Sequence, residues 1–144
     1  MRTPRNAKRS VASPRRANVS SVRGQSIVEL ALTLPLLMVL MAGVLDLAHA
    51  FSVAGILSNA AREGARYGAT DPTNTAEITN RVVEEAAGAP LTIDPSRVFV
   101  NTDSGTTSGN PITVEVTYDV DLLLAQALGL PQPTIRRQAT MAIF

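Results

Sequence analysis

A single apolar block near the N-terminus limits what this 144-residue chain can fold into. The block runs from Ile27 to Phe51, and its central part, Leu30 to Leu45, contains no charged residue. A helix rises about 1.5 Å per residue and the hydrocarbon core of a bilayer is about 30 Å thick, so about 20 apolar residues can cross it. The remaining chain is too short to surround such a helix. We therefore predict one transmembrane helix that spans about residues 27–50.

Basic residues are concentrated before this block. Residues 1–23 contain seven Lys or Arg and no acid, whereas residues 24–144 contain six basic residues and all twelve acids. Because Lys and Arg flanking a membrane helix stay in the cytoplasm, we expect the N-terminus inside the cell and the C-terminus outside. Residues 1–24 then form a basic cytoplasmic leader, which we expect to be disordered when free. The leader has no aromatic residue that could stack on a base, so we do not expect nucleic acid as a partner.

The pattern beyond the membrane predicts that the helix continues to Thr70 and that residues 71–144 form a small extracytoplasmic domain. Asp71-Pro72 stops the helix, and residues 76–87 show the four-residue spacing of an amphipathic helix. Alternating or β-branched runs predict strands at residues 97–102, 112–121 and 134–144. The predicted fold class is therefore α+β. A long N-terminal transmembrane helix, residues 25–70, precedes a domain with one or two short helices and a small antiparallel sheet of about three strands.

Small residues recur every four positions in the second half of the predicted helix, at Ala60, Gly64 and Gly68. Such rows let helices approach closely. Each glycine costs an exposed helix about 1 kcal/mol relative to alanine. That cost favours a helix-packing role for Gly64 and Gly68, although simple tolerance of small residues is the alternative for either one.

Polar pairs along the same helix offer little for catalysis. Asp46 and His49 lie three residues apart, which predicts one shared helix face and a pair at the membrane surface rather than a metal site, since no third ligand is near. Glu63 and Arg66 have the spacing of a helix-surface ion pair. The chain has one His, no Cys, no catalytic triad and no phosphate-binding loop. We expect no enzymatic activity, no cofactor and no metal.

The segment before the apolar block is the most informative. It reads Arg23-Gly24-Gln25-Ser26-Ile27-Val28-Glu29-Leu30, with a glycine directly before the membrane helix and a glutamate five residues later. This arrangement resembles the prepilin-peptidase site of type IV pilins and pseudopilins. The resemblance implies cleavage between Gly24 and Gln25, frequent methylation of the new N-terminus, and a role for Glu29 in assembly.

The continuation, GQSIVELALTLPLLMVLMAGVLDLAHAF and then NAAREGARYGA, is similar to the TadE-like family of tight-adherence pilus systems. The C-terminal LLLAQALGLP and RRQATMAIF fit the family more loosely. The resemblance implies a minor pilin or pseudopilin of a type IVb or Flp-type pilus, or of a related secretion apparatus, that serves cell adhesion. It also implies residence in the bacterial cytoplasmic (inner) membrane or in surface pili. The implied partners are the lipid bilayer, a prepilin peptidase, other pilin-like subunits and the assembly machinery, in a hetero-oligomer.

Physical reasoning supports a role for Glu29 independently of the family. Acids near the bilayer core are costly and are usually paired. Cleavage after Gly24 would create an amine on Gln25, and in a helical assembly the Glu29 of one subunit could meet the amine of a neighbour. The alternative is that Glu29 lies hydrated at the membrane surface.

Two other classes of protein remain open. The first is an unprocessed bitopic anchor of an envelope complex. The second is a secreted protein, since Ala48-His49-Ala50 offers a signal-peptidase site before Phe51. A signal sequence, however, has an apolar region of about 7–15 residues, which is shorter than this block. The N-terminal residue of the mature protein distinguishes these classes.

Overall fold

The first element, helix α1, runs without interruption from Val19 to Thr70. The computed structural model describes residues 19–89 and 91–144, with side chains from Gly24 on, so most of the expected leader lies outside the described residues. The helix begins six residues before the predicted start at Gln25. No proline lies between Val19 and Pro35, and adding a turn to an existing helix costs little compared with nucleating one. The predicted end before Asp71-Pro72 is confirmed.

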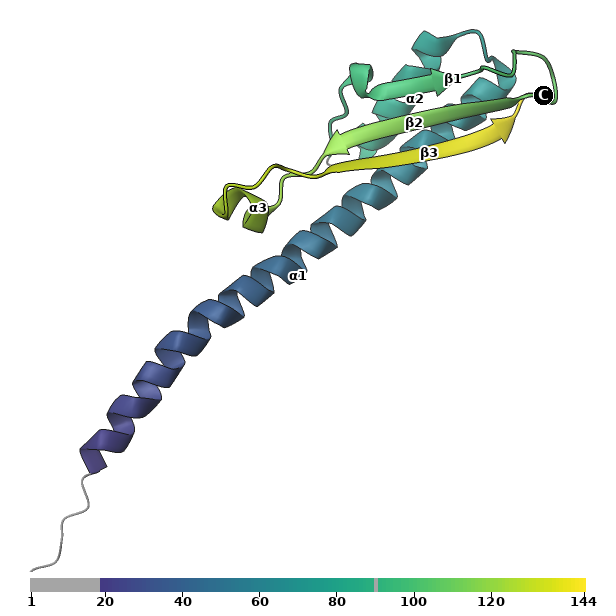
Figure 1. The fold of residues 1–144 in the computed structure, drawn as a ribbon. Coiled ribbons are helices and arrows are strands. Elements are labelled where there is room, and N and C mark those ends of the chain that lie inside the picture. Colours follow the sequence, from purple (N-terminus) through teal and green to yellow (C-terminus); the bar gives the residue numbers. More distant parts are fainter. Residues whose placement is uncertain (1–18, 90) are drawn as a thin grey trace, which may run out of the picture. The chain divides into compact units, whose positions relative to one another are not determined.

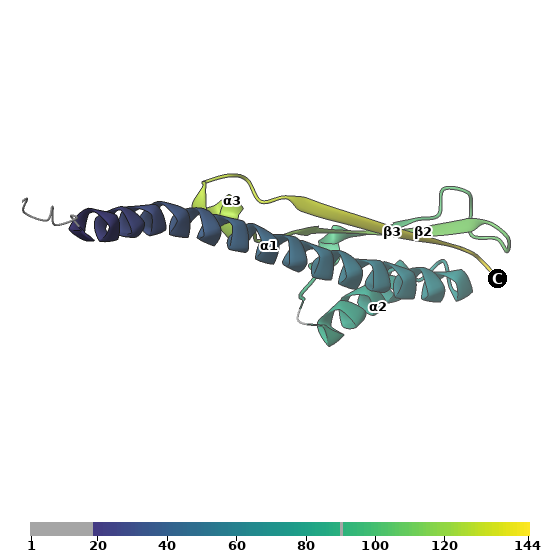
Figure 2. The same cartoon turned by 90° about the horizontal axis from the view of Figure 1, so that it is seen from below.

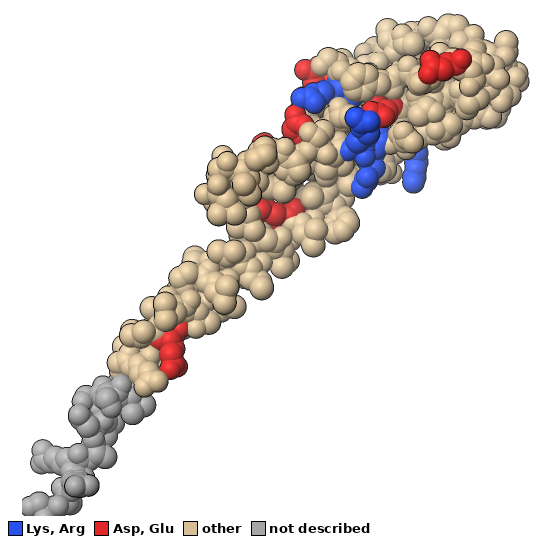
Figure 3. Space-filling model, viewed as in Figure 1, with Lys and Arg blue, Asp and Glu red and all other residues tan. Residues whose placement is uncertain are grey.

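The N-terminal part of α1 presents a large apolar surface. α1 is long and apolar enough to cross a membrane, and its most apolar stretch is not buried within the described protein. Leu36 and Leu40, for example, are 67% and 65% exposed. Figure 3 shows the helix as largely free of charge, whereas charged side chains gather over the domain. A helix with aliphatic side chains exposed all round needs a nonpolar environment such as a bilayer.

The chain divides into two compact units, residues 1–37 and 38–144. The second unit combines the C-terminal half of α1 with all later elements (Figure 1). These are α2 (Thr75–Gly88), the 3-10 helix η1 (Pro95–Arg97), β1 (Val98–Asn101), β2 (Pro111–Asp119), α3 (Leu123–Ala127) and β3 (Thr134–Ala142). The three strands form an antiparallel sheet in the order β1-β2-β3, which confirms the predicted α+β class.

This second unit is a two-layer structure in which one face of the sheet packs against α1 and α2 (Figure 2). The alternation predicted for β2 is confirmed at Ile112, Val114 and Val116, which are fully buried. Thr117 is also buried, and its hydroxyl lies 3.5 Å from the carbonyl oxygen of Arg97. The amphipathic α2 contributes a buried row to the same core, namely Ile78, Val82 and Ala86. The domain is therefore built on α1 and shares its core with that helix.

Candidate functional site

The residues expected to act in processing and assembly lie together in the N-terminal part of α1. Gly24 and Gln25 are part of α1, and a Cβ atom added at Gly24 would meet no atom within 4 Å. The side-chain amide of Gln25 donates a hydrogen bond to Glu29 Oε1 at 3.2 Å, so the two residues share one helix face. Both are exposed. The structure thus keeps the Glu29 carboxylate accessible, one helical turn from the bond expected to be cut.

The hydrogen-bond partners of Asp46 in the structure differ from the predicted partner, His49. Asp46 is only 7% exposed, whereas His49 is exposed, so they do not share an environment. Both oxygens of the Asp46 carboxylate accept backbone hydrogen bonds at 2.8 Å, one from the N–H of Leu123 and one from that of Leu124. The carboxylate therefore caps the first turn of α3, whose own N-cap residue, Leu122, provides no side-chain hydrogen bond. The expected Asp46–His49 surface pair is wrong.

Asp46 is the residue whose role sequence reasoning missed. Its two donors lie 77 and 78 residues later in the chain, so no local spacing could reveal the contact. The available signal was an acid that ends a 16-residue uncharged run, Leu30 to Leu45. An acid at the edge of a membrane helix requires a partner, and backbone N–H groups can serve as one.

The predicted ion pair between Glu63 and Arg66 is confirmed. The Arg66 guanidinium donates two hydrogen bonds to the Glu63 carboxylate, at 2.9 and 2.6 Å. These bonds lower the pKa of Glu63 and raise the pKa of Arg66. Because the Arg66 side chain is largely exposed, the pair contributes little to stability and leaves a charged patch on the outer face of α1.

Gly64 and Gly68 lie where α1 meets α2 and β2. A Cβ atom at Gly64 would be 2.5 Å from Val82 Cγ2, and one at Gly68 would be 2.6 Å from Ile112 Cδ1. Both distances are shorter than carbon atoms tolerate. The glycines therefore allow the domain to approach its own helix, and the close packing is within the chain.

The comparisons with known proteins bear on the same part of the chain. Residues 24–66 match the family model described as TadE-like protein. The match includes the expected cleavage position, Glu29, the apolar block and the Glu63–Arg66 pair. No curated protein and no solved structure matches the chain. Together with the exposed apolar helix, the match identifies residues 24–66 as a TadE-like segment and fits a pilin-like, membrane-anchored protein.

Proposed function

We propose that this protein is a minor pilin-like subunit that is cut after Gly24 and helps to assemble a tight-adherence pilus or a related secretion apparatus. Its role is structural and not enzymatic. The match of residues 24–66 to the TadE-like family model carries the proposal, because it covers both the cleavage position and Glu29. In this proposal the N-terminus faces the cytoplasm, the domain lies outside, and the subunit joins other pilin-like proteins after processing.

The contacts between α1 and the domain support retention of the part of α1 that follows Gly24 in the mature protein. Signal-peptidase cleavage before Phe51 would remove Asp46, which binds the first turn of α3 through both carboxylate oxygens. It would also remove Gly43, at which an added Cβ would lie 3.4 Å from Leu124 Cδ1. The folded domain uses these residues, which disfavours the secreted class. Cleavage after Gly24 leaves them in place.

The N-terminal residue of the mature protein tests the proposal. We expect a chain produced together with a prepilin peptidase to begin at Gln25, as read by N-terminal sequencing and intact mass. Gly24→Leu should remain full-length, and it should still fold because the space around Gly24 is open. A mature start at Phe51 would assign the protein to the secreted class. An intact leader in the presence of an active peptidase would assign it to the bitopic anchors.

Orientation is a separate prediction. The excess of basic residues before the span predicts that the C-terminus is outside the cytoplasm. A periplasm-active reporter, such as alkaline phosphatase, should be active when fused after Phe144, whose side chain is 84% exposed. A fusion after Arg23 that lacks the span should be inactive. The predicted orientation would be wrong if a reporter that is active only in the cytoplasm were active when fused after Phe144.

A further inference from the structure

The connection between β2 and β3 has the surface of a membrane-contacting loop. After the exposed Asp121 it contains no charged residue from Leu122 to Pro133, and α3 lies within it. Three of its leucines are exposed, at 57, 69 and 56% of their surface: Leu123, Leu128 and Leu130. Loops that face water seldom expose three large aliphatic side chains within eight residues.

This loop lies beside the apolar part of α1. Asp46 binds its first turn, and Gly43, one turn nearer the centre of the predicted span, faces Leu124. The adjoining positions on α1 are themselves exposed and apolar, at Val44, Leu45 and Leu47. The apolar surface of the loop is therefore continuous with the surface of a helix that already requires a nonpolar environment.

Most backbone N–H groups of the loop donate hydrogen bonds within the protein. The N–H of Leu122 donates to Gln132 Oε1 at 2.8 Å, and the N–H of Leu130 donates to the carbonyl of Ala125 at 2.8 Å. Further bonds run from Gln126, Leu128 and Gly129 to carbonyls within the loop, while Pro131 and Pro133 have no N–H. The hydrocarbon core of a bilayer offers no hydrogen-bond partner, so a backbone N–H group that enters it needs an acceptor within the protein.

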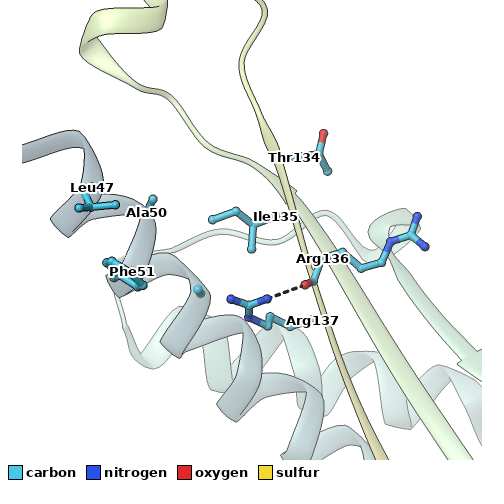
Figure 4. A pocket seen from close by; sticks show the side chains of 8 residues that line it. Leu47, Ala50, Phe51, Thr134, Ile135, Arg136 and Arg137 are labelled. Atoms are coloured by element: carbon cyan, nitrogen blue, oxygen red, sulfur yellow. Dashed lines mark hydrogen bonds between the residues drawn. The ribbon is translucent and has the colours of Figure 1, made fainter. Parts of the chain in front are cut away.

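A cation lies beside a groove between α1 and the start of β3, next to the loop. An open groove of about 300 Å³ lies between α1 and β3, and Figure 4 shows Ile135 and Arg137 facing Leu47 and Phe51 across it. The Arg137 guanidinium donates to the carbonyl of Arg136 at 3.2 Å, and no acid is paired with it among the described residues. Arg136 instead pairs with Glu115 on the outer face of the sheet. An arginine just beyond an apolar loop is placed to meet lipid phosphates.

We propose that the β2–β3 connection is a second membrane contact of this protein. The loop enters the leaflet on the domain's side of the bilayer, next to α1, with its leucines among the acyl chains and Arg137 at the phosphate level. Interfacial helices reach a depth of about 5–10 Å. Asp46 acts as a positioning residue that holds the loop at this depth. The proposal requires that α1 spans the membrane and does not depend on pilus assembly.

Depth-dependent fluorescence quenching tests the proposal on the full chain in vesicles of phosphatidylcholine and phosphatidylglycerol. The chain has no cysteine, so a single-cysteine variant carries one environment-sensitive dye. The test variant is Leu128→Cys, with Leu40→Cys in the span and Ser108→Cys in the β1–β2 loop as controls. We expect lipids with a shallow nitroxide to quench the Leu128 label, and lipids with a deep nitroxide to quench the Leu40 label, at least twofold more than they quench the Ser108 label. Aqueous iodide should quench the Ser108 label most strongly.

Two outcomes would overturn the proposal. A Leu128 label that iodide quenches as strongly as the Ser108 label would place the loop in water. A label shielded from both quenchers would show that protein, such as a second copy of this chain, covers the loop. Asp46→Asn replaces one acceptor oxygen by a donor, so it should raise iodide access at Leu128 severalfold without changing the Leu40 label. An unchanged Leu128 label in that variant would refute the positioning role of Asp46.

Discussion

Glu29→Leu is expected to accumulate as a processed membrane protein and to support no pili. An acid at a helix centre costs membrane insertion about 2.5–3.5 kcal/mol and less near a helix end, so removing it should not impair insertion. The cut after Gly24 lies five residues away and should persist. What is lost is the partner for the amine of a neighbouring Gln25. Breaking a buried ion pair by removing one member costs about 3–5 kcal/mol, which weakens each subunit contact by roughly a hundredfold or more. Membrane fractionation measures the accumulation of the processed protein, and a piliation assay measures the loss of pili.

The structure defines the controls for this experiment. Gln25 donates a hydrogen bond to Glu29 within the same helix. Gln25→Ala removes that local bond and keeps the charge of Glu29, so it should retain piliation. Glu29→Gln keeps the size and loses the charge, so it should fail as Glu29→Leu does. Normal piliation with Glu29→Leu would refute the pairing role, and equal failure of Gln25→Ala would assign the defect to the local helix bond.

Asp46 is unsuitable as a neutral comparison in that assay. It is also an acid near the end of the membrane segment, but it binds the backbone of α3. Asp46→Leu would leave two N–H groups without their acceptor and would disturb the domain. Any loss of piliation in that variant would have a different cause from the loss in Glu29→Leu.

Gly64→Ala is expected to destabilise the domain, although alanine is the better helix former. The added Cβ would lie 2.5 Å from Val82 Cγ2 and 3.3 Å from Val114 Cγ1. Overpacking a core costs about 1–3 kcal/mol, which exceeds the gain of about 1 kcal/mol in helix propensity or cancels it at the lower limit. A loss of 1 kcal/mol lowers Tm by about 4–8 °C in a domain of 60–100 residues. Thermal unfolding of the full chain in detergent, followed by near-ultraviolet circular dichroism, measures the shift.

The same helix provides a matched control in Gly55, which is exposed and has no atom within 4 Å of an added Cβ. Gly55→Ala should raise Tm, because it gains helix propensity without a clash. Val82→Ala removes the atom that Gly64→Ala would meet, so the double variant should be more stable than the sum of the single effects implies. Equal responses of Gly64→Ala and Gly55→Ala would show that close packing does not govern the site.

The sequence predicted the elements because their signals are local. The end of α1 before Asp71-Pro72, the buried row of α2 and the alternation of β2 follow from spacing and turn residues within a few positions. The TadE-like resemblance also rested mainly on the N-terminal half of the chain, and the family match covers residues 24–66. These features are set by neighbours in the chain.

Contacts between distant segments could not be predicted in this way. The spacing of Gly64 and Gly68 indicated close packing, but their partners on α2 and β2 depend on how the chain folds back. Asp46 appeared to face His49 because only neighbours on the helix were visible in the sequence. Its real donors are brought to it by the β2–β3 connection. The TadE-like resemblance and the order of the elements could therefore be predicted from the sequence, whereas the tertiary contacts of Asp46 could not.

The separation between Asp46 and α3 also orders events during biosynthesis. The ribosome makes Leu123 77 residues after Asp46, which takes about 4–15 s at 5–20 residues per second. The apolar part of α1 can enter the translocon within that interval, before the backbone donors to Asp46 have been made. α3 can dock only after the sheet's second strand has been translated. Closure of this contact is thus a late maturation step, and a nascent chain that stops before Leu123 would carry an anchored helix whose acid has not yet met its backbone donors.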